Sequence, residues 1–521
     1  MKQKLLITII TLCATIGLSA QHATIAIFSL NDFHGGFVKD TSKDIPGVAA
    51  IWQTLDSLRA IYPHNITVSA GDNFGGSYFY KATKEKPLPV FFNKIGIDLS
   101  AVGNHEFDDG VEKLAKKWAD TRPAGWDITY VCANVTDSLG QIPLYMQPTA
   151  IREIPISPKK SVKVGFLGLL TSSTPAQVSK SRIKGLQFSG DYKSAIEKYK
   201  HQISNADIRL TLMHVGTTMR NGKPAWNDPD EANLLSINDP FFHGMLTGHS
   251  HEPVVGRINN TQYPAVQGKW HGEYISIIKC RIDTNTMKVV SAEPELVPVN
   301  PNITLDSEKQ ALANYIDSLL RTTTIGGEPL EEKIAYSREQ LIHDRSDKYK
   351  QTRMGELVCE SYAEAVRKAG SYPDEQVIIG MSHFGSIRGG FNKGIVRVLD
   401  VGEALPFANS IKVFELSGKQ IKKLVDFGLH NEKYGWLQTG WLEIETNAHR
   451  HVRRLNYISP KGKKIKIKNR KKYLVAVDSY QAEGGDGYGP VYFIPQCEIK
   501  LKGLPNTMEA FTKYLKEIKT F

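Results

Sequence analysis

Five short motifs rich in aspartate, asparagine and histidine lie in the first half of the chain. They are Asn31-Asp32-Phe33-His34-Gly35, Gly71-Asp72-Asn73, Gly103-Asn104-His105-Glu106-Phe107-Asp108, the single His214, and Gly248-His249-Ser250-His251. Mixtures of imidazole and carboxylate suit zinc, manganese or iron better than calcium or magnesium, which prefer all-oxygen ligands. The motifs therefore predict a metal centre built from several parts of the chain.

Such a set of side chains could hold two cations rather than one. A single carboxylate can bridge two metal ions about 3.5–4 Å apart, and such a pair clamps a phosphoryl group and lowers the pKa of a bound water. Each motif alone is weak, because an Asp-x-His is frequent by chance and an isolated histidine after a strand is more often structural. All five in order are hard to explain by packing.

The elements that must position these motifs are strands, because each motif follows a run of β-forming apolar residues. The runs are Ala23–Leu30, Ile66–Ala70, Leu99–Val102, Ile208–Met213 and Met245–Thr247. Ligands of open α/β sheets bind at the carboxyl ends of the strands. Further strands are predicted at Val162–Leu170 and, as a pair, at Tyr263–Val266 and Tyr274–Ile282, with helices at Val48–Ile61 and Gly110–Ala119. The pattern indicates a layered α/β domain with a mixed sheet.

The length of 521 residues exceeds what one hydrophobic core usually organises, so at least two domains are expected. We place the first at 21–300 and the second at 329–521. The linker, 301–328, contains a predicted helix at Asp306–Arg321. The second domain is predicted to open with a strand at Lys333–Tyr336 and a helix near Met354–Ala369.

The first twenty residues have the pattern of a secretory signal peptide. Lys2 and Lys4 precede an apolar run from Leu5 to Leu18, and Ser19-Ala20 provides small residues for cleavage after Ala20. We expect an exported, periplasmic or secreted protein of bacterial type. No other run is long enough to span a membrane, and an uncleaved anchor is the less favoured alternative.

The remaining cysteines and the positive charge carry less information. Cys132, Cys280, Cys359 and Cys497 are widely spaced, so the spacing specifies no disulfide and buried free thiols are an equal alternative. The formal net charge is +11, and much of it lies in the basic stretch Lys461–Lys472. A polyanion-binding patch is one interpretation; we favour a solvated hairpin, because Ile465 and Ile467 alternate with lysines.

The five motifs together resemble the calcineurin-like metallophosphoesterases, and more closely the 5′-nucleotidase/UDP-sugar hydrolase family. The resemblance implies a four-layer α/β/β/α sandwich followed by a C-terminal α+β nucleotide-binding domain, joined by a helix. It also implies two divalent metal ions of the zinc, manganese or iron type. Asp32, His34 and His251 would hold one ion, Asn104, His214 and His249 the other, and Asp72 would bridge both. His105 would face the substrate phosphate and Asp108 would orient it. Relatives often carry Gln or Asn where this chain has His251.

The resemblance extends to three segments of the second domain. His383-Phe384-Gly385-Ser386-Ile387-Arg388 is similar to a glycine-rich segment whose arginine binds the phosphate or carboxylate side of the substrate. The family's usual Asn is His383 here, which leaves open the nucleoside contact made by that Asn. Leu405–Asn409 would supply Phe407, and Asp478–Tyr488 would supply Tyr480, as the two faces of a base-stacking clamp, with Asp486 accepting ribose hydroxyls. Arg367 is a looser candidate for phosphate binding.

The implied activity is removal of phosphate from nucleoside 5′-monophosphates by direct attack of metal-bound hydroxide. The same metals could instead serve UDP-sugars, dinucleotides, 2′,3′-cyclic nucleotides or 3′-nucleotides, and the altered His383-Phe384 segment keeps these alternatives open. An exported nucleotide-binding protein without turnover is a third, weaker interpretation, because no ligand is missing. The expected partner is a small nucleotide, not a nucleic acid polymer. The sequence does not define the base preference or the oligomeric state. Nucleotide scavenging or removal of extracellular nucleotides is the implied role.

Overall fold

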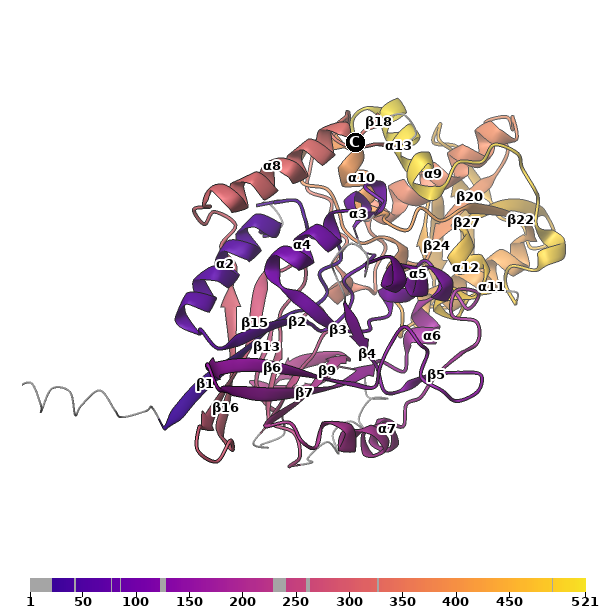
Figure 1. Cartoon of the computed structure of the whole chain (residues 1–521). Helices are drawn as coiled ribbons and strands as arrows, with labels where there is room; N and C mark the ends of the chain where they lie inside the picture. The colour runs from indigo at the N-terminus through magenta and orange to yellow at the C-terminus, as the bar shows by residue number, and fades with distance from the viewer. Residues whose placement is uncertain are drawn as a thin grey trace, which may run out of the picture.

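The structure is a computed structural model of the chain, and it describes residues 21–521 except 42–43, 76, 85, 122–127, 228–239, 259–262, 326–327 and 490. The signal peptide predicted at 1–20 lies outside the described residues. Figure 1 shows an N-terminal part in indigo to magenta and a C-terminal part in orange to yellow, lying side by side.

The first sheet has six strands in the order β16-β15-β1-β2-β3-β4. Their bounds are β1 His22–Leu30, β2 Asn65–Ser69, β3 Ile97–Ala101, β4 Thr129–Val131, β15 Tyr274–Asp283 and β16 Val289–Pro298. Strands β1 to β4 run parallel, while β15 and β16 are antiparallel to their neighbours. The carboxyl ends of the parallel strands therefore meet at one edge of the sheet.

The second sheet also has six strands, in the order β13-β14-β12-β9-β7-β6. Their bounds are β6 Thr149–Ser157, β7 Lys160–Leu170, β9 Ile208–His214, β12 Gly244–Leu246, β13 Val254–Arg257 and β14 Pro264–Gln267. The inner faces of the two sheets share one core, which includes Ile27, Val68, Phe166 and Leu210, all fully buried. Such face-to-face packing of two sheets buries the apolar side of each strand.

Helices cover the outer faces and complete four layers. On the first sheet lie α2 (Val48–Ile61), whose bounds agree with the prediction, and α4 (Pro87–Ile95). On the second lies α7 (Tyr192–Tyr199), which packs against Leu167 and Met213. Another helix, α5, spans Val111–Thr121. The α/β/β/α sandwich implied by the resemblance is confirmed.

One predicted pairing is wrong. β14 and β15 do not pair with each other: β14 pairs with β12 and β13 in the second sheet, whereas β15 pairs with β1 and β16 in the first. The intervening residues 268–273 cross between the sheets. Both strands are apolar and close in sequence, and that pattern cannot tell a hairpin from a crossing between stacked sheets.

Helix α8 (Ser307–Thr322) falls at the predicted connector and packs against α2. Asp306 caps its first turn by accepting from the N–H groups of Glu308 and Lys309. The second domain follows, with β19 Lys333–Ser337, α9 Arg353–Ala369, α10 Val398–Ala404, α11 Gly418–Leu429 and α13 Thr507–Ile518 around a sheet of order β22-β27-β20-β23. The exact domain boundaries stay a prediction.

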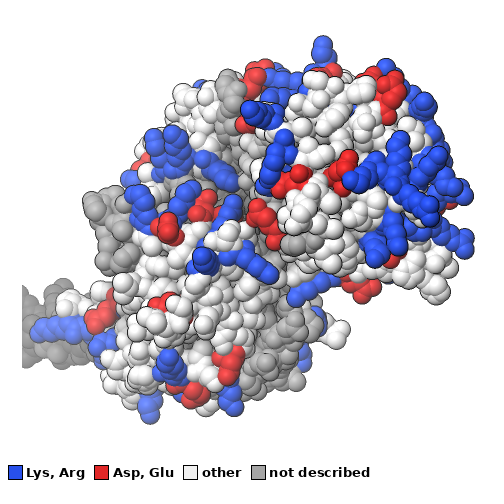
Figure 2. All heavy atoms as spheres, turned by 90° about the vertical axis from the view of Figure 1, so that its right-hand side faces the viewer, with Lys and Arg blue, Asp and Glu red and all other residues white. Residues whose placement is uncertain are grey.

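The sheet of the second domain comprises β20 Ile378–Ser382, β22 Ile411–Ser417, β23 Gln438–Thr439 and β27 Lys472–Asp478. A separate three-stranded sheet is formed by β24 Leu442–Thr446, β25 Val452–Ile458 and β26 Lys464–Lys466. Ile465 and Ile467 pack on the core of this domain while the neighbouring lysines are exposed, as expected for the hairpin interpretation of the basic stretch. Figure 2 shows Lys and Arg gathered on one side of this domain.

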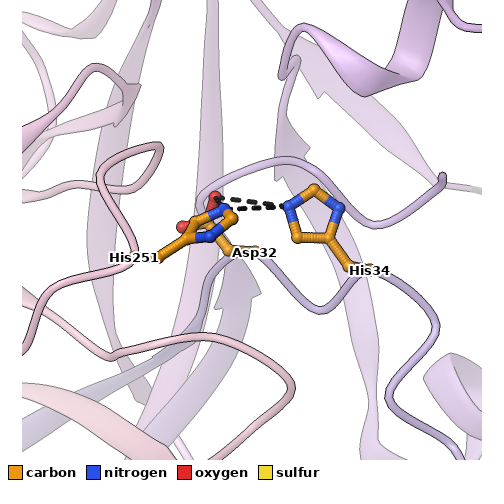
Figure 3. Close-up of side chains that lie close together, drawn as sticks. All are labelled: Asp32, His34 and His251. Atoms are coloured by element: carbon orange, nitrogen blue, oxygen red, sulfur yellow. Dashed lines mark hydrogen bonds and ion pairs between the residues drawn. The ribbon is translucent and has the colours of Figure 1, made fainter. Parts of the chain in front are cut away.

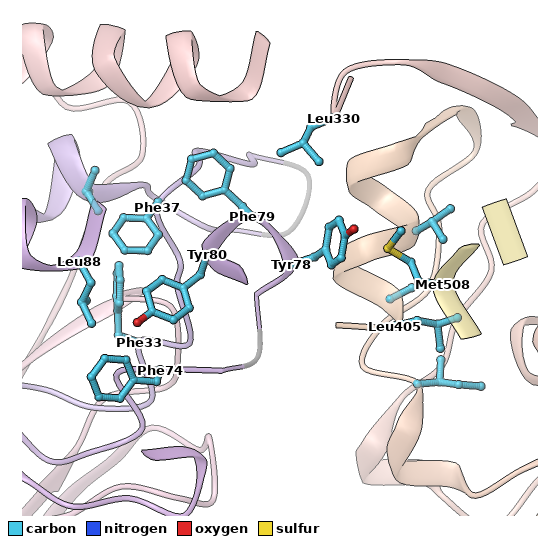
Figure 4. Close-up of a cluster of buried hydrophobic side chains, with 14 of the residues drawn as sticks. Phe33, Phe37, Phe74, Tyr78, Phe79, Tyr80, Leu88, Leu330, Leu405 and Met508 are labelled. Carbon is cyan, nitrogen blue, oxygen red and sulfur yellow. The ribbon is translucent and has the colours of Figure 1, made fainter. Parts of the chain in front are cut away.

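A continuous apolar core connects the two domains. Helix α3 (Tyr78–Ala82) of the first domain lies against α10 of the second. Figure 4 shows Phe33, Phe37 and Phe79 on one side and Leu330, Leu405 and Met508 on the other, with Tyr78 between them. A Cβ at Gly402 would lie 2.0 Å from Tyr78 Cδ1, so only glycine permits this approach.

The structure also answers two questions left by the sequence, the state of the cysteines and the presence of membrane-spanning helices. Cys132, Cys280 and Cys359 are buried free thiols, and Cys497 is a partly exposed one. None of the helices among the described residues is both long and apolar enough to cross a membrane.

Candidate metal centre and substrate cleft

The five predicted motifs meet at one place between the two sheets. Asp32 and His34 follow β1, Asp72 follows β2, and Asn104 follows β3. From the second sheet, His214 ends β9, while His249 and His251 follow β12. The side chains of Asp32, Asp72 and His214 are all but inaccessible to water.

One group of three side chains consists of Asp32, His34 and His251, shown in Figure 3. The Nε2 atoms of His34 and His251 are 3.0 Å apart. Asp32 Oδ1 lies 3.3 Å from His251 Nε2 and 3.8 Å from His34 Nε2. Three ligand atoms that converge this closely from separate loops suit a shared cation.

A second group consists of Asp72, His214 and His249. Asp72 Oδ2 lies 3.0 Å from His214 Nε2 and, on its other side, 3.5 Å from His34 Nε2 of the first group. This carboxylate is therefore within reach of both groups. Asn104 Oδ1 is buried and has no hydrogen-bond partner among the described residues, as expected of an oxygen reserved for a cation.

The electrostatics of the cluster match a cation site. Burial alone would raise the pKa of Asp72, but His214 and His105 outweigh it and hold the pKa of that carboxyl well below its usual range. Burial lowers the pKa of His34 well below its usual range, and burial with the neighbouring His214 lowers the pKa of His249 to about 3. Ionised carboxylates and neutral imidazoles are the forms that bind metals.

The pKa of His214 is shifted in the opposite direction from those of His34 and His249. Burial opposes its protonation, yet Asp72 and Asp32 raise the pKa of His214 to about 10. The two carboxylates thus draw a positive charge to the position between them. A metal ion placed there would supply that charge in place of the proton, so the residues fit a divalent cation.

The backbone at the site is strained. Asp32, His34, Asp72, His249 and His251 have φ values of 48°, 45°, 53°, 85° and 59°. Non-glycine residues rarely adopt this left-handed region, and such strain concentrates at functional sites. Gly103 permits the closest approach of two loops, because a Cβ there would lie 2.2 Å from Asp72 Oδ1.

His105 lies beside these two groups of side chains and contacts a further carboxylate, Asp108. Its Nδ1 lies 2.7 Å from Asp108 Oδ2, and its backbone N–H donates to Asp72 Oδ1 at 2.8 Å. Burial opposes protonation, but Asp108 and Asp72 raise the pKa of His105. Asp108 thereby fixes the ring and favours its charged form.

Sequence reasoning missed two residues that hold the ligand loops. Glu106, buried in the cluster, accepts from the backbone N–H groups of Asp72, Asn73 and Gly103. Burial and then Asp72 raise the pKa of Glu106 to about 7. Asn31 donates from Nδ2 to Asp32 Oδ2 at 2.7 Å. Both residues lie within the predicted motifs, so a carboxylate or amide close in sequence to a proposed ligand could have identified them.

Two other neighbours carried no sequence signal. The Trp270 ring stacks on the His251 ring with centroids 5.0 Å apart, and Gln177 Nε2 lies 3.1 Å from His249 Nε2. They come from the crossing after β14 and from the short helix α6 (Thr174–Gln177).

A cleft of about 2040 Å³ opens over the metal groups and is lined by both domains. Arg388, Phe407, Tyr480, Asp486 and His383 of the second domain all line it, opposite Asp72, Asn104 and His105. The guanidinium of Arg388 lies 4.8 Å from the Phe407 ring centroid. The Phe407 and His105 rings are nearly parallel, with an interplanar angle of 14° and centroids 6.1 Å apart.

His383 and Asp486 form a buried pair. His383 Nδ1 donates to Asp486 Oδ2 at 2.7 Å, and Tyr480 Oη donates to Asp486 Oδ1 at 3.1 Å. Tyr480 Oη also lies 3.1 Å from the Ala176 carbonyl oxygen of the first domain. Burial opposes protonation of His383, but Asp486 and Asp478 raise its pKa. Asp486 therefore has partners on both oxygens.

The structure does not bring Arg367 to the cleft. Its side chain is buried on α9 and donates to the carbonyl oxygen of Pro373 at 2.6 Å and to Tyr457 Oη at 3.2 Å. Glu364 pairs with it on the same helix at 3.3 Å. These contacts give Arg367 a structural role in place of the phosphate contact predicted for it.

Comparisons with known proteins agree with this architecture. A model of the calcineurin-like phosphoesterases matches residues 25–253, and a model of the 5′-nucleotidase C-terminal domain matches residues 330–492. The chain is 24% identical to a 5′-nucleotidase of Vibrio vulnificus over 89% of this chain and 85% of that protein. It is 23% identical to the endonuclease YhcR of Bacillus subtilis, covering 78% of this chain but only 33% of that longer protein.

Among solved structures, a 5′-nucleotidase precursor of Thermus thermophilus has the same fold. The TM-score is 0.74 at 22% identity, and the match covers 96% of this chain and 97% of that one. The two-domain arrangement is thus shared over nearly the whole chain.

Proposed function

The chain belongs to the family that joins a calcineurin-like phosphoesterase domain to a 5′-nucleotidase C-terminal domain, and on this premise we propose that it is an exported two-metal phosphohydrolase of nucleoside 5′-monophosphates. The observation that carries the proposal is the shared cleft. Phosphoesterase ligands from one domain and the Arg388–Phe407 pair from the other face the same space.

The ligand roles follow from the two groups. Asp32, His34 and His251 would hold one ion, and His214, His249 and Asn104 the other. Asp72 would bridge them, which its contacts of 3.0 Å and 3.5 Å to the two groups support. When bound, two divalent ions neutralise phosphoryl charge and make a water nucleophilic at neutral pH.

Side chains of the protein would supply the proton and bind the substrate. His105, held at Nδ1 by Asp108, carries a proton that can stabilise a phosphoryl oxygen or pass to the leaving ester oxygen. Arg388 offers a planar fork of donors suited to a phosphate or carboxylate. Phe407 offers an apolar ring face for a nucleobase, with Tyr480 as the proposed second face. Export rests on the pattern at 1–20.

A second candidate keeps the metals and changes the substrate to a UDP-sugar, a 2′,3′-cyclic nucleotide or a 3′-nucleotide. The His383–Asp486 pair favours the cyclic and 3′-nucleotides within this set, because the carboxylate proposed to receive ribose hydroxyls already has two donors and these substrates have fewer free ribose hydroxyls to offer it.

An assay of released phosphate together with the nucleoside and nucleotide products distinguishes the two, because the first hydrolysis of a UDP-sugar or a cyclic phosphate releases no inorganic phosphate. The purified chain, loaded with Mn²⁺ or Zn²⁺, is given each class of substrate beside the Asp72→Ala variant. We expect release from 5′-nucleotides that is lost in the variant. No phosphate from AMP with strong hydrolysis of cyclic nucleotides would favour the second candidate, and binding without any hydrolysis would leave only a nucleotide-binding protein.

A further inference from the structure

A second kind of histidine cluster lies outside the cleft, on the surface of the C-terminal domain. We propose that Asp426, His430 and His451 form a separate binding site for one divalent transition-metal cation such as Zn²⁺. One ligand atom from each of these three side chains lies within 4.8 Å of the others.

The helix brings two of the ligands together. Asp426 lies on α11 and His430 caps its C-terminal end, so the two are four residues apart and share one face. His451 reaches them from the turn between β24 and β25, and its ring lies 4.6 Å from that of His430. The site thus joins α11 to the three-stranded sheet.

Backbone groups orient Asp426 and His430, as the outer partners of metal ligands do. The Val452 N–H donates to Asp426 Oδ1 at 2.8 Å, while Oδ2 lies 3.2 Å from His451 Nδ1. His430 Nδ1 donates to the Asp426 carbonyl oxygen at 2.7 Å, which fixes the ring and directs Nε2 to the other side.

The surroundings of His430 Nε2 call for a positive charge. The neighbour on that side of the ring is another acceptor, the His449 carbonyl oxygen at 3.1 Å. A neutral imidazole has one donor, so it cannot satisfy two carbonyl groups at once. A metal ion bound at Nε2, with the His449 carbonyl oxygen beside it, would satisfy that side of the ring.

The neighbouring cation does not fill this role. Arg450 pairs with Glu432 at 3.5 Å and lies 5.7 Å from the Trp436 ring centroid. Two imidazoles and one carboxylate are a donor set that selects zinc, copper or nickel over magnesium and calcium. The His449 carbonyl oxygen or a water would complete four ligands.

The site has a structural connection to the cleft. Asn431 follows His430, and its Nδ2 donates to the Asp486 carbonyl oxygen at 2.9 Å. Glu432, Lys433 and Tyr434, next in the chain, line the cleft. A cation at His430 would therefore anchor both the end of α11 and the loop that holds Asp486.

The test is a zinc count on the full chain. Wild type, His451→Ala and Asp426→Asn are dialysed against the same buffered free Zn²⁺, and bound zinc is measured by elemental analysis. His201→Ala, which removes an exposed histidine of the first domain, is the matched control. We expect each cluster variant to hold one equivalent less than wild type and the control to hold the same.

A second readout separates the site from the cleft. Zn²⁺ should raise the unfolding midpoint of wild type more than that of His451→Ala, and zinc affinity at the site should fall by roughly 100-fold or more. His451 is largely exposed, so its removal leaves the circular dichroism spectrum unchanged. Equal zinc content in wild type and both cluster variants overturns the proposal. If wild type held one zinc equivalent more than the cluster variants but released no phosphate from any substrate, the proposed function of the cleft would fail and the separate zinc site would stand.

Discussion

The His105 ring of the phosphoesterase domain and the Phe407 ring of the C-terminal domain lie nearly parallel across the cleft, with centroids 6.1 Å apart. They are far apart in sequence, and neither domain contains both. The proposed chemistry and the proposed substrate recognition therefore depend on how the two domains are held together.

Replacement of the bridging carboxylate tests the metal assignment. Asp72 lies within 3.5 Å of both histidine groups, so Asp72→Asn removes the charge that both ions share. We expect phosphate release to fall by roughly 100-fold or more and metal content to fall with it. Asp44→Asn, which changes an exposed carboxylate outside the cluster, is the control. Unchanged metal content and activity in Asp72→Asn would contradict the assignment.

Removal of His105 should depend on the leaving group. A proton donor matters most when the leaving oxygen is a poor leaving group, and general acid catalysis contributes roughly 10²–10⁴-fold. His105→Ala should lower kcat for AMP strongly and for p-nitrophenyl phosphate much less. Equal losses on both substrates would assign His105 to phosphoryl stabilisation alone.

The effect of metal removal should be reversible, and only some cations should reverse it. Dialysis against a chelator removes the cations that the carboxylates and imidazoles share and leaves only a proton on His214 in their place, so we expect activity to vanish and the unfolding midpoint to fall. Zn²⁺, Mn²⁺ or Fe²⁺ should restore both, whereas Ca²⁺ should not, because the proposed ligands include several histidines. Restoration by Ca²⁺ at equal concentration would argue for an all-oxygen site elsewhere.

The contact between α3 and α10 should be intolerant of a single methyl group. Gly402→Ala places a Cβ against the Tyr78 ring, and overpacking of this kind costs about 1–3 kcal/mol. We expect a lower unfolding midpoint and reduced activity. Gly389→Ala is the control, because nothing lies within 4 Å of its added Cβ. Equal midpoints for the two variants would show that the interface adjusts.

One partly buried histidine outside the cleft, His243, should make stability depend on pH. Burial and then Arg209 lower the pKa of His243 to about 4, from an ordinary 6.5. Between these values the unfolded chain binds a proton that the folded chain does not, so the free energy of unfolding falls as pH falls through this window. His243→Gln, which keeps an acceptor for the Arg209 N–H, should weaken that dependence. Unfolding midpoints at pH 7 and pH 5 provide the measurement, and identical differences in both proteins would refute it.

The convergence of the proposed ligands was partly predictable, because each motif directly follows a strand and parallel strands of one sheet end at a common edge. Asp32, Asp72 and Asn104, which follow β1, β2 and β3 of the first sheet, could therefore be placed near one another from local patterns, whereas the approach of His214 from the second sheet depends on how the two sheets stack. Trp270 and Gln177 could not, because their roles arise only when separate loops meet. The pairing of β14 with β12 rather than β15 is equally non-local. Arg367 shows the converse error: a motif-like arginine on a helix can be turned inward and satisfied by carbonyl oxygens and Tyr457.

The His383–Asp486 pair shows a limit of motif transfer. The departure at His383 was visible in the sequence, but its partner lies 103 residues away. Only the fold reveals that the substituted side chain binds the very carboxylate assigned to the substrate.

The apolar core shared by the two domains bears on how this chain can be divided. Tyr78 of α3 lies between apolar side chains of the first domain and Leu330, Leu405 and Met508, which follow the first domain in the chain. Cutting the gene at the linker would expose these side chains on each fragment, and exposed patches of this kind promote aggregation. Each domain thus contributes its own part of the proposed site, but neither is expected to be soluble alone. Either domain produced separately would need polar residues in place of the apolar ones at this interface.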